Sequence, residues 1–154
     1  DTGVPQGGGG PIGPLPDLRA AVDTLSCGTI ASYGTPEIGS SGSPALISAA
    51  GGSPSVGNPS FSIDLTGGNP SSFCVLFSGL SPGSNVQPWG TILVAGPSFF
   101  RTYSSTNGAV NASVPILIPP SLAGVTMHYQ YAVRDPGFGG NVQGSDALAV
   151  TFCP

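Results

Sequence analysis

Charged side chains are scarce in this chain of 154 residues. It contains three Arg, no Lys and seven acidic residues, so 6% of its residues are charged and its net charge is −4. Proteins that bind DNA or RNA neutralise phosphates with Lys and Arg, and this composition therefore argues against a nucleic-acid partner. No run approaches the roughly 20 apolar residues of a membrane-spanning helix, so we expect no membrane span.

Side chains that could act as catalytic bases are equally few. The only histidine, His128, falls on the polar face of its expected strand, where a solvated or interface position is the simplest interpretation. No GxSxG motif is present, and the carboxyl groups of Glu37, Asp64, Asp135 and Asp146 show no spacing that would pair them across a glycosidic bond. We therefore expect neither enzymatic activity nor a cofactor.

Cysteine occurs three times, at Cys27, Cys74 and Cys153, without the CxxC spacing of zinc sites or thioredoxin-like motifs. In an oxidising compartment one pair would form a disulfide, and the third thiol would be free or bonded to another chain. The pairs 27–74, 27–153 and 74–153 all stay open, as does the alternative of three buried thiols in a reduced protein.

Two further features are typical of a secreted protein. Cytoplasmic domains usually carry about 25% charged residues, far more than the 6% found here. The chain starts at Asp1 rather than Met and shows no signal-peptide pattern, as expected of a mature product whose signal peptide has been removed. We expect an extracellular or cell-surface location.

Glycine and proline are abundant, with 25 and 17 residues, and their distribution divides the chain into three parts. Residues 1–16 form a Gly/Pro-rich arm without apolar alternation, which favours extended backbone. Residues 17–29 hold the one expected helix and a connector, since Asp17 can cap a helix and Gly28 can end it. Residues 30–154 consist of short apolar runs between turn residues, which predicts a β-sandwich domain.

The predicted fold is all-β, an antiparallel sandwich of about eight strands with immunoglobulin-like or Greek-key connections. Apolar and polar residues alternate most clearly within 60–66 and 125–134, as in strands with one buried face. Asn107-Gly108 is typical of a tight hairpin turn, here between a strand ending near Ser105 and one beginning at Ala109. The eight expected strands are 44–50, 60–66, 72–80, 90–95, 98–104, 109–118, 125–134 and 147–153.

Several short motifs occur in a set order along residues 33–154. They are YGT from Tyr33, GSPAL from Gly42, GSPSVGN from Gly52, FSIDL from Phe61, VLFSG from Val75, ILIP from Ile116, LAG from Leu122, YQYAV from Tyr129 and DPG from Asp135. The set resembles an uncharacterised domain of exported proteins in planctomycetes and similar bacteria, often found at the C-terminus of large surface proteins. The resemblance implies an exported β-sandwich, and it implies no activity and no catalytic residues. A Cys that follows the Tyr-Gly pair in that family is absent here, and the arm with Cys27 is additional.

The loop before the last expected strand contains oxygen ligands that calcium could use. Asp135, Asn141 and Asp146 are the weak calcium candidates, but their spacing matches no EF-hand. A Gly-rich loop joining two strands explains the same residues, so we expect no metal site.

A glycan ligand is suggested by Trp89, which stands in a Pro- and Gly-containing loop. An exposed indole there could stack on a sugar ring, with Tyr103 and Gln87 contributing, and secreted sandwiches often bind ligands through their loops. The competing interpretation is that the only tryptophan fills the core. A secreted carbohydrate- or surface-binding module is therefore the alternative functional hypothesis.

The first functional hypothesis is a structural protein that assembles with copies of itself into a filament or surface array. A surface with so few charges lacks the residues that protect exposed sheet edges from pairing. The arm could pack on a neighbouring subunit and so build a homopolymer, or it could wrap its own domain. The arm residues expected to make these contacts are Val4, Pro5, Pro11, Ile12, Pro14 and Leu15.

Overall fold

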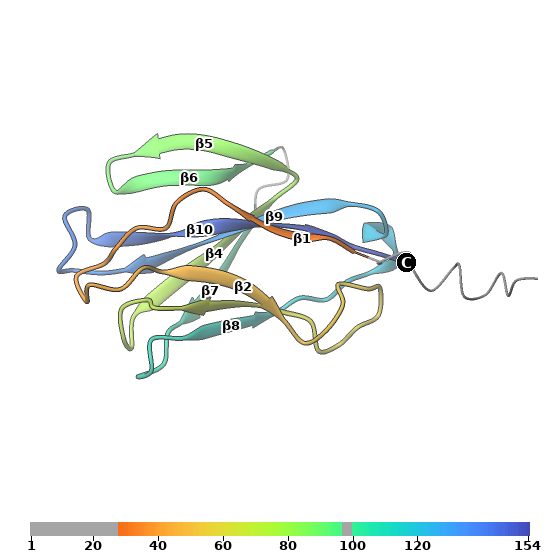
Figure 1. Cartoon of the computed structure of the whole chain (residues 1–154), viewed down its shortest axis with the longest axis horizontal. Helices are drawn as coiled ribbons and strands as arrows, with labels where there is room; N and C mark the ends of the chain where they lie inside the picture. Colours follow the sequence, from red (N-terminus) through yellow and green to blue (C-terminus); the bar gives the residue numbers. More distant parts are fainter. Residues whose placement is uncertain (1–27, 97–99) are drawn as a thin grey trace, which may run out of the picture.

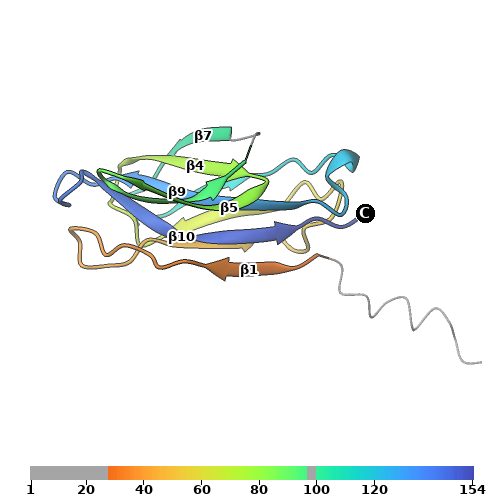
Figure 2. The same cartoon turned by 90° about the horizontal axis from the view of Figure 1, so that it is seen from above.

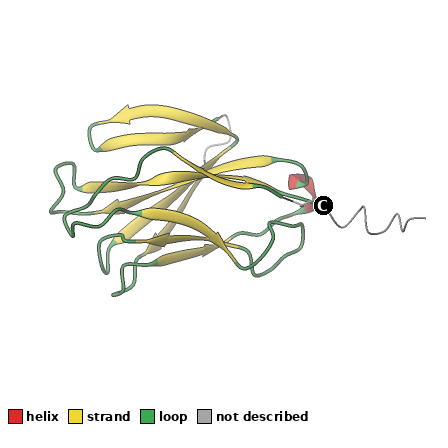
Figure 3. Ribbon diagram, in the orientation of Figure 1, coloured by secondary structure: helices red, strands yellow, loops and turns green. Residues whose placement is uncertain are grey.

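The computed structural model describes residues 28–96 and 100–154. This part of the chain is all-β apart from one 3₁₀ turn, which confirms the predicted antiparallel β-sandwich (Figure 3). The arm of residues 1–16 and the helix expected after it lie outside the described residues. The elements are β1 (Ile30–Tyr33), β2 (Leu46–Ala50), β3 (Ser62–Thr66), β4 (Phe73–Gly79), β5 (Ser81–Gln87), β6 (Gly90–Ala95), β7 (Phe100–Ser105), β8 (Ala112–Pro115), η1 (Pro120–Leu122), β9 (Thr126–Arg134) and β10 (Val142–Thr151).

The strands form two packed sheets and a separate hairpin. The larger sheet has the order β1-β10-β9-β4-β7, and the smaller has the order β2-β3-β8. Strands β3 and β8 are neighbours although they are far apart in sequence, as are β4 and β9, which is Greek-key connectivity. The β5–β6 hairpin lies on the side of the larger sheet away from the smaller one, so the molecule has three layers (Figures 1 and 2).

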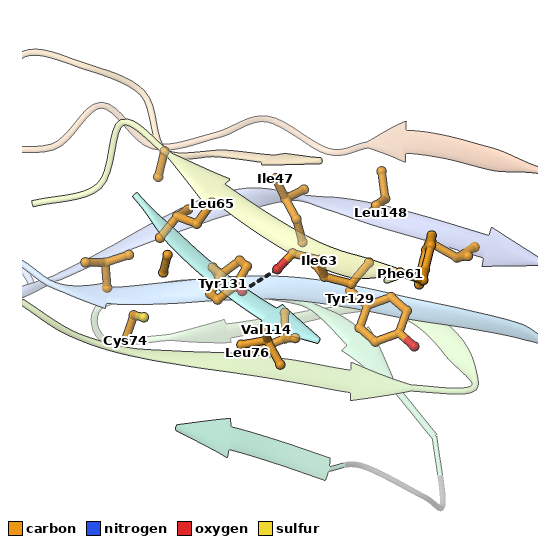
Figure 4. Close-up of a cluster of buried hydrophobic side chains, with 14 of the residues drawn as sticks. Ile47, Phe61, Ile63, Leu65, Cys74, Leu76, Val114, Tyr129, Tyr131 and Leu148 are labelled. Atoms are coloured by element: carbon orange, nitrogen blue, oxygen red, sulfur yellow. Dashed lines mark hydrogen bonds between the residues drawn. The ribbon is translucent and has the colours of Figure 1, made fainter. Parts of the chain in front are cut away.

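The core lies between the two sheets and comes from the alternating segments. Phe61, Ile63 and Leu65 are fully buried, and so are Tyr131 and Val133 on β9. The Tyr131 hydroxyl donates a hydrogen bond to the Ile63 carbonyl at 2.7 Å and thereby ties the two sheets together (Figure 4). Period-two alternation therefore identified the inward-facing side chains correctly.

The structure has two strands that the sequence did not predict. One is β1, an edge strand of the larger sheet. The other is β5, whose sequence SPGSNVQ contains a single large apolar residue and so shows no strand pattern. A register shift between Pro82 and Asn85 accommodates the turn-like start of β5 within its pairing to β6. Strand β10 also begins at Val142, five residues before its predicted start, because Gln143 and Ser145 are buried polar residues and produce no apolar alternation.

The prediction of a hairpin at Asn107-Gly108 is wrong. Strand β7 pairs with β4 in the larger sheet, whereas β8 pairs with β3 in the smaller one. The Asn107 Oδ1 accepts hydrogen bonds from the N–H groups of Ala109 and Asn111, which closes a local turn. The chain therefore crosses from one sheet to the other at this turn instead of folding back on β7.

Candidate functional site

A groove of about 560 Å³ lies between the β5–β6 hairpin and the outer face of β4 and β7. Its lining combines aromatic, aliphatic and amide side chains with one charged residue. The lining residues are Val75, Phe77, Asn85, Gln87, Trp89, Ile92, Val94, Ala95, Gly96, Arg101 and Tyr103.

The floor of the groove is built by the pairing of β4 with β7. Val75 lies opposite Tyr103 and Phe77 opposite Arg101, so these four side chains share the face turned away from the core. The Arg101 Cζ lies 5.8 Å from the centre of the Phe77 ring, within cation–π range. Phe77 is 6% exposed, whereas Tyr103 is 63% exposed and stacks on the ring of Phe73.

The wall of the groove is the β5–β6 hairpin. Asn85 and Gln87 come from β5, and Trp89 stands in the turn before β6. Trp89 is half-buried and borders the groove, so it does not fill the core. Gly140, in the β9–β10 loop, lies so close to Trp89 that a Cβ there would stand 2.6 Å from the Trp89 Cα.

A buried glutamine attaches the hairpin to the larger sheet. The Gln130 side chain is 3% exposed, and its Nε2 donates to the carbonyls of Thr91 and Ser145, at 3.1 and 3.0 Å. Its Oε1 accepts the Leu93 N–H at 2.8 Å. Gln130 thus provides hydrogen-bond partners for the Thr91 carbonyl and the Leu93 N–H, two main-chain groups of β6 that no neighbouring strand pairs. These bonds hold the groove wall in place.

A tyrosine and the single histidine add a second attachment. The Tyr33 hydroxyl donates to the Leu93 carbonyl at 2.8 Å, and the His128 Nδ1 lies 3.0 Å from the same hydroxyl. Burial lowers the pKa of His128 and raises that of Tyr33 to about 12. The polar face expected on this strand is therefore an internal interface covered by the hairpin, which corrects the solvated alternative for His128.

The remaining carboxylates considered for catalysis do not border this groove. Asp64 accepts hydrogen bonds from the hydroxyls of Ser62 and Ser113 on the three-stranded sheet. The Glu37 Oε2 accepts the Gly144 N–H at 2.6 Å. Among the residues that the structure describes, Arg101 is the one charged side chain that lines the groove.

The calcium candidates do not converge. Burial alone would raise the pKa of Asp135, but hydrogen bonds, chiefly from the hydroxyl and N–H of Ser40, outweigh it and lower this pKa. Asp146 lies within β10, accepts the Ile47 N–H, and has its pKa raised by burial. Asn141 is exposed. Within residues 28–96 and 100–154, no three acidic, Cys or His side chains form a cluster able to hold a metal.

The cysteines occupy different environments. Cys74 is a free thiol in the core, and burial raises its pKa. This removes two of the three pairs considered, and leaves 27–153 as the pair to test. Cys27 lies outside the described residues.

The structure brings together the two residues proposed for ligand stacking, Trp89 and Tyr103, and the contributing Gln87. Gln87 and Trp89 belong to the β5–β6 hairpin and Tyr103 to β7, and all three line one groove. Sequence reasoning missed Arg101 and Asn85. Arg101 lies two positions before Tyr103 on an expected strand, so strand alternation places both on one face and could have revealed it. The assembly residues of the arm lie outside the described residues.

Comparisons with known proteins identify no relative. No family model, no curated protein and no solved structure matches this chain. The resemblance to a planctomycete surface domain therefore stays a prediction. In the described part of the chain, no helix is long and apolar enough to cross a membrane.

Proposed function

We propose that this domain is a secreted carbohydrate-binding module and that the groove beside the β5–β6 hairpin is its site. The observation that carries the proposal is the meeting of Trp89 and Tyr103 across one groove. Sugar rings present apolar C–H faces that pack on aromatic rings, and hydroxyl rims that bond to polar groups. The amides of Asn85 and Gln87 can supply both donors and acceptors to that rim.

The dimensions of the groove agree with this proposal. Its volume of about 560 Å³ falls in the usual range of ligand sites. Tyr103 is largely exposed, whereas Phe77 at the floor is buried, so the groove is open at the β7 side. An open groove suits one segment of a polysaccharide better than an enclosed small molecule.

The test is retention on polysaccharides. Trp89→Ala removes the indole from the wall, and we expect it to abolish retardation in native gels that contain a polysaccharide bound by the unmodified protein. Leu117→Ala is the matched control, because Leu117 is 83% exposed and does not line the groove. Equal retardation of the Trp89 variant and the unmodified protein would remove the stacking role.

A second candidate function is self-assembly into an extracellular filament or surface array. The specific observation is strand β7, which forms an edge of the larger sheet and exposes Phe100 and Tyr103. An edge strand offers unpaired main-chain groups to another chain, and in β7 Arg101 is the only charge that would oppose such pairing. Assembly and glycan binding are compatible in a cell-surface protein.

Deletion of residues 1–16 tests whether the arm drives this assembly. We expect the intact protein to form regular polymers visible by electron microscopy, and the truncated protein to lose them. Polymerisation that is equal in both proteins would show that the arm is not required. The deletion removes none of the groove residues listed above, and we expect glycan retention to persist.

A further inference from the structure

We propose that the groove selects anionic polysaccharides, and that Arg101 binds their carboxylate or sulfate groups. This inference rests on the proposed glycan site and names the class of ligand. It follows from where the protein places one of its few cations.

Arg101 is held where a bound sugar would meet it. It lies directly across from Phe77, and its guanidinium stands over that ring at 5.8 Å. Tyr103 follows two positions later on the same face of β7, about 7 Å along the strand. A sugar stacked on Tyr103 would therefore have its substituents beside the guanidinium.

The chemistry of the guanidinium favours oxyanions over hydroxyls. Its planar array of N–H donors matches two oxygens of a carboxylate or sulfate at once, which gives a charge-assisted, bidentate contact. A neutral sugar could offer only single, uncharged acceptors. The buried ring of Phe77 beneath the guanidinium excludes water from one of its faces.

The rest of the groove lining does not oppose an anion. None of the lining residues in the described part of the chain is acidic, although acidic residues outnumber basic ones by seven to three in the whole sequence. The chain has no Lys, so no general basic surface competes with Arg101 for an anionic polymer. With a net charge of −4, attraction of such a polymer has to be local to the groove.

Affinity electrophoresis of the whole chain tests the inference with three probes. The gels contain polygalacturonate as the carboxylated polymer, dextran sulfate as the sulfated polymer, or unmodified dextran as the neutral one. We expect the protein to bind at least one anionic probe more tightly than dextran. Arg101→Gln should weaken this binding about 5- to 10-fold, and added NaCl should weaken it as well. The probe that responds identifies carboxylate or sulfate as the ligand group.

Arg134→Gln is the matched control because it removes the same charge, from an exposed residue that does not line the groove. Its binding should equal that of the unmodified protein. Equal weakening by both variants would mean that net charge alone matters, and would overturn the inference. So would binding of dextran at least as tightly as of both anionic probes. Thermal melting of each variant checks that it is folded.

The outcomes separate this inference from the glycan proposal. If Trp89→Ala abolishes binding while Arg101→Gln leaves it unchanged, the groove binds glycans but the assignment of Arg101 is wrong. If the unmodified protein binds none of the three probes, this inference is overturned. The wider glycan proposal is then decided by the retention test with other polysaccharides.

Discussion

The hydrogen bond between Tyr131 and Ile63 makes a sharp test of how the two sheets are held together. Tyr131 is fully buried on β9, and its hydroxyl donates to the Ile63 carbonyl of β3 at 2.7 Å. Tyr131→Phe removes one oxygen atom and keeps the ring that fills the core. The change therefore isolates the hydrogen bond from the packing.

The expected cost follows from the burial of both groups. A buried carbonyl that loses a hydrogen-bond donor costs about 1–3 kcal/mol, and we expect about 2 kcal/mol here. For a domain of this size, that corresponds to a fall in the melting temperature of about 4–8 °C. Equilibrium urea denaturation should show a lower midpoint with an unchanged slope, because the surface exposed on unfolding stays nearly the same.

Tyr129 supplies the matched control on the same strand and the same face. It is equally buried, but its hydroxyl contacts the sulfur of Met127 at 3.6 Å, which is a weak acceptor. Tyr129→Phe should therefore cost less than about 0.5 kcal/mol. If the two substitutions cost the same, or if Tyr129→Phe costs more, the bond between the sheets does not have the role assigned to it.

Three further predictions concern the loop behind the groove, acid stability and the thiols. Gly140→Ala should displace the indole in the hairpin turn and weaken polysaccharide retention several-fold, whereas Gly139→Ala, with no atom within 4 Å of the added Cβ, should not. The lowered pKa of Asp135 means that its carboxylate stabilises the fold fully above the unfolded-state pKa of about 3.9. This contribution is lost as the pH falls through the lower folded-state pKa. The urea concentration at the unfolding midpoint should therefore decrease between about pH 4 and 2 in the unmodified protein, and it should decrease less in Asp135→Asn, which has no carboxylate to protonate at this position. Under non-reducing conditions, thiol counting should find Cys74 protected in the native protein and one reactive thiol per chain after unfolding; three would show that no disulfide forms.

The candidate site was only partly readable in the sequence. Trp89 and Gln87 were identifiable because a tryptophan in a Pro- and Gly-containing loop is a recognisable pattern. Their meeting with Tyr103 depends on the β5–β6 hairpin folding over the outer face of the larger sheet. The hairpin is held there by the side chain of Gln130, a polar residue whose position in an alternating strand would ordinarily indicate exposure to solvent.

The sequence by itself determined the fold class and much of the core. Alternation at Phe61, Ile63 and Leu65 reflects a local property, because successive side chains of a strand point to opposite faces. Only the tertiary structure decided the sheet partners on either side of Asn107. The side chain of Asn107 closes its turn locally, but the partners of β7 and β8 are distant in sequence. The groove was decided in the same way, since the hairpin that forms its wall is held by hydrogen bonds from Gln130 and Tyr33, which lie dozens of positions from Leu93 in the sequence.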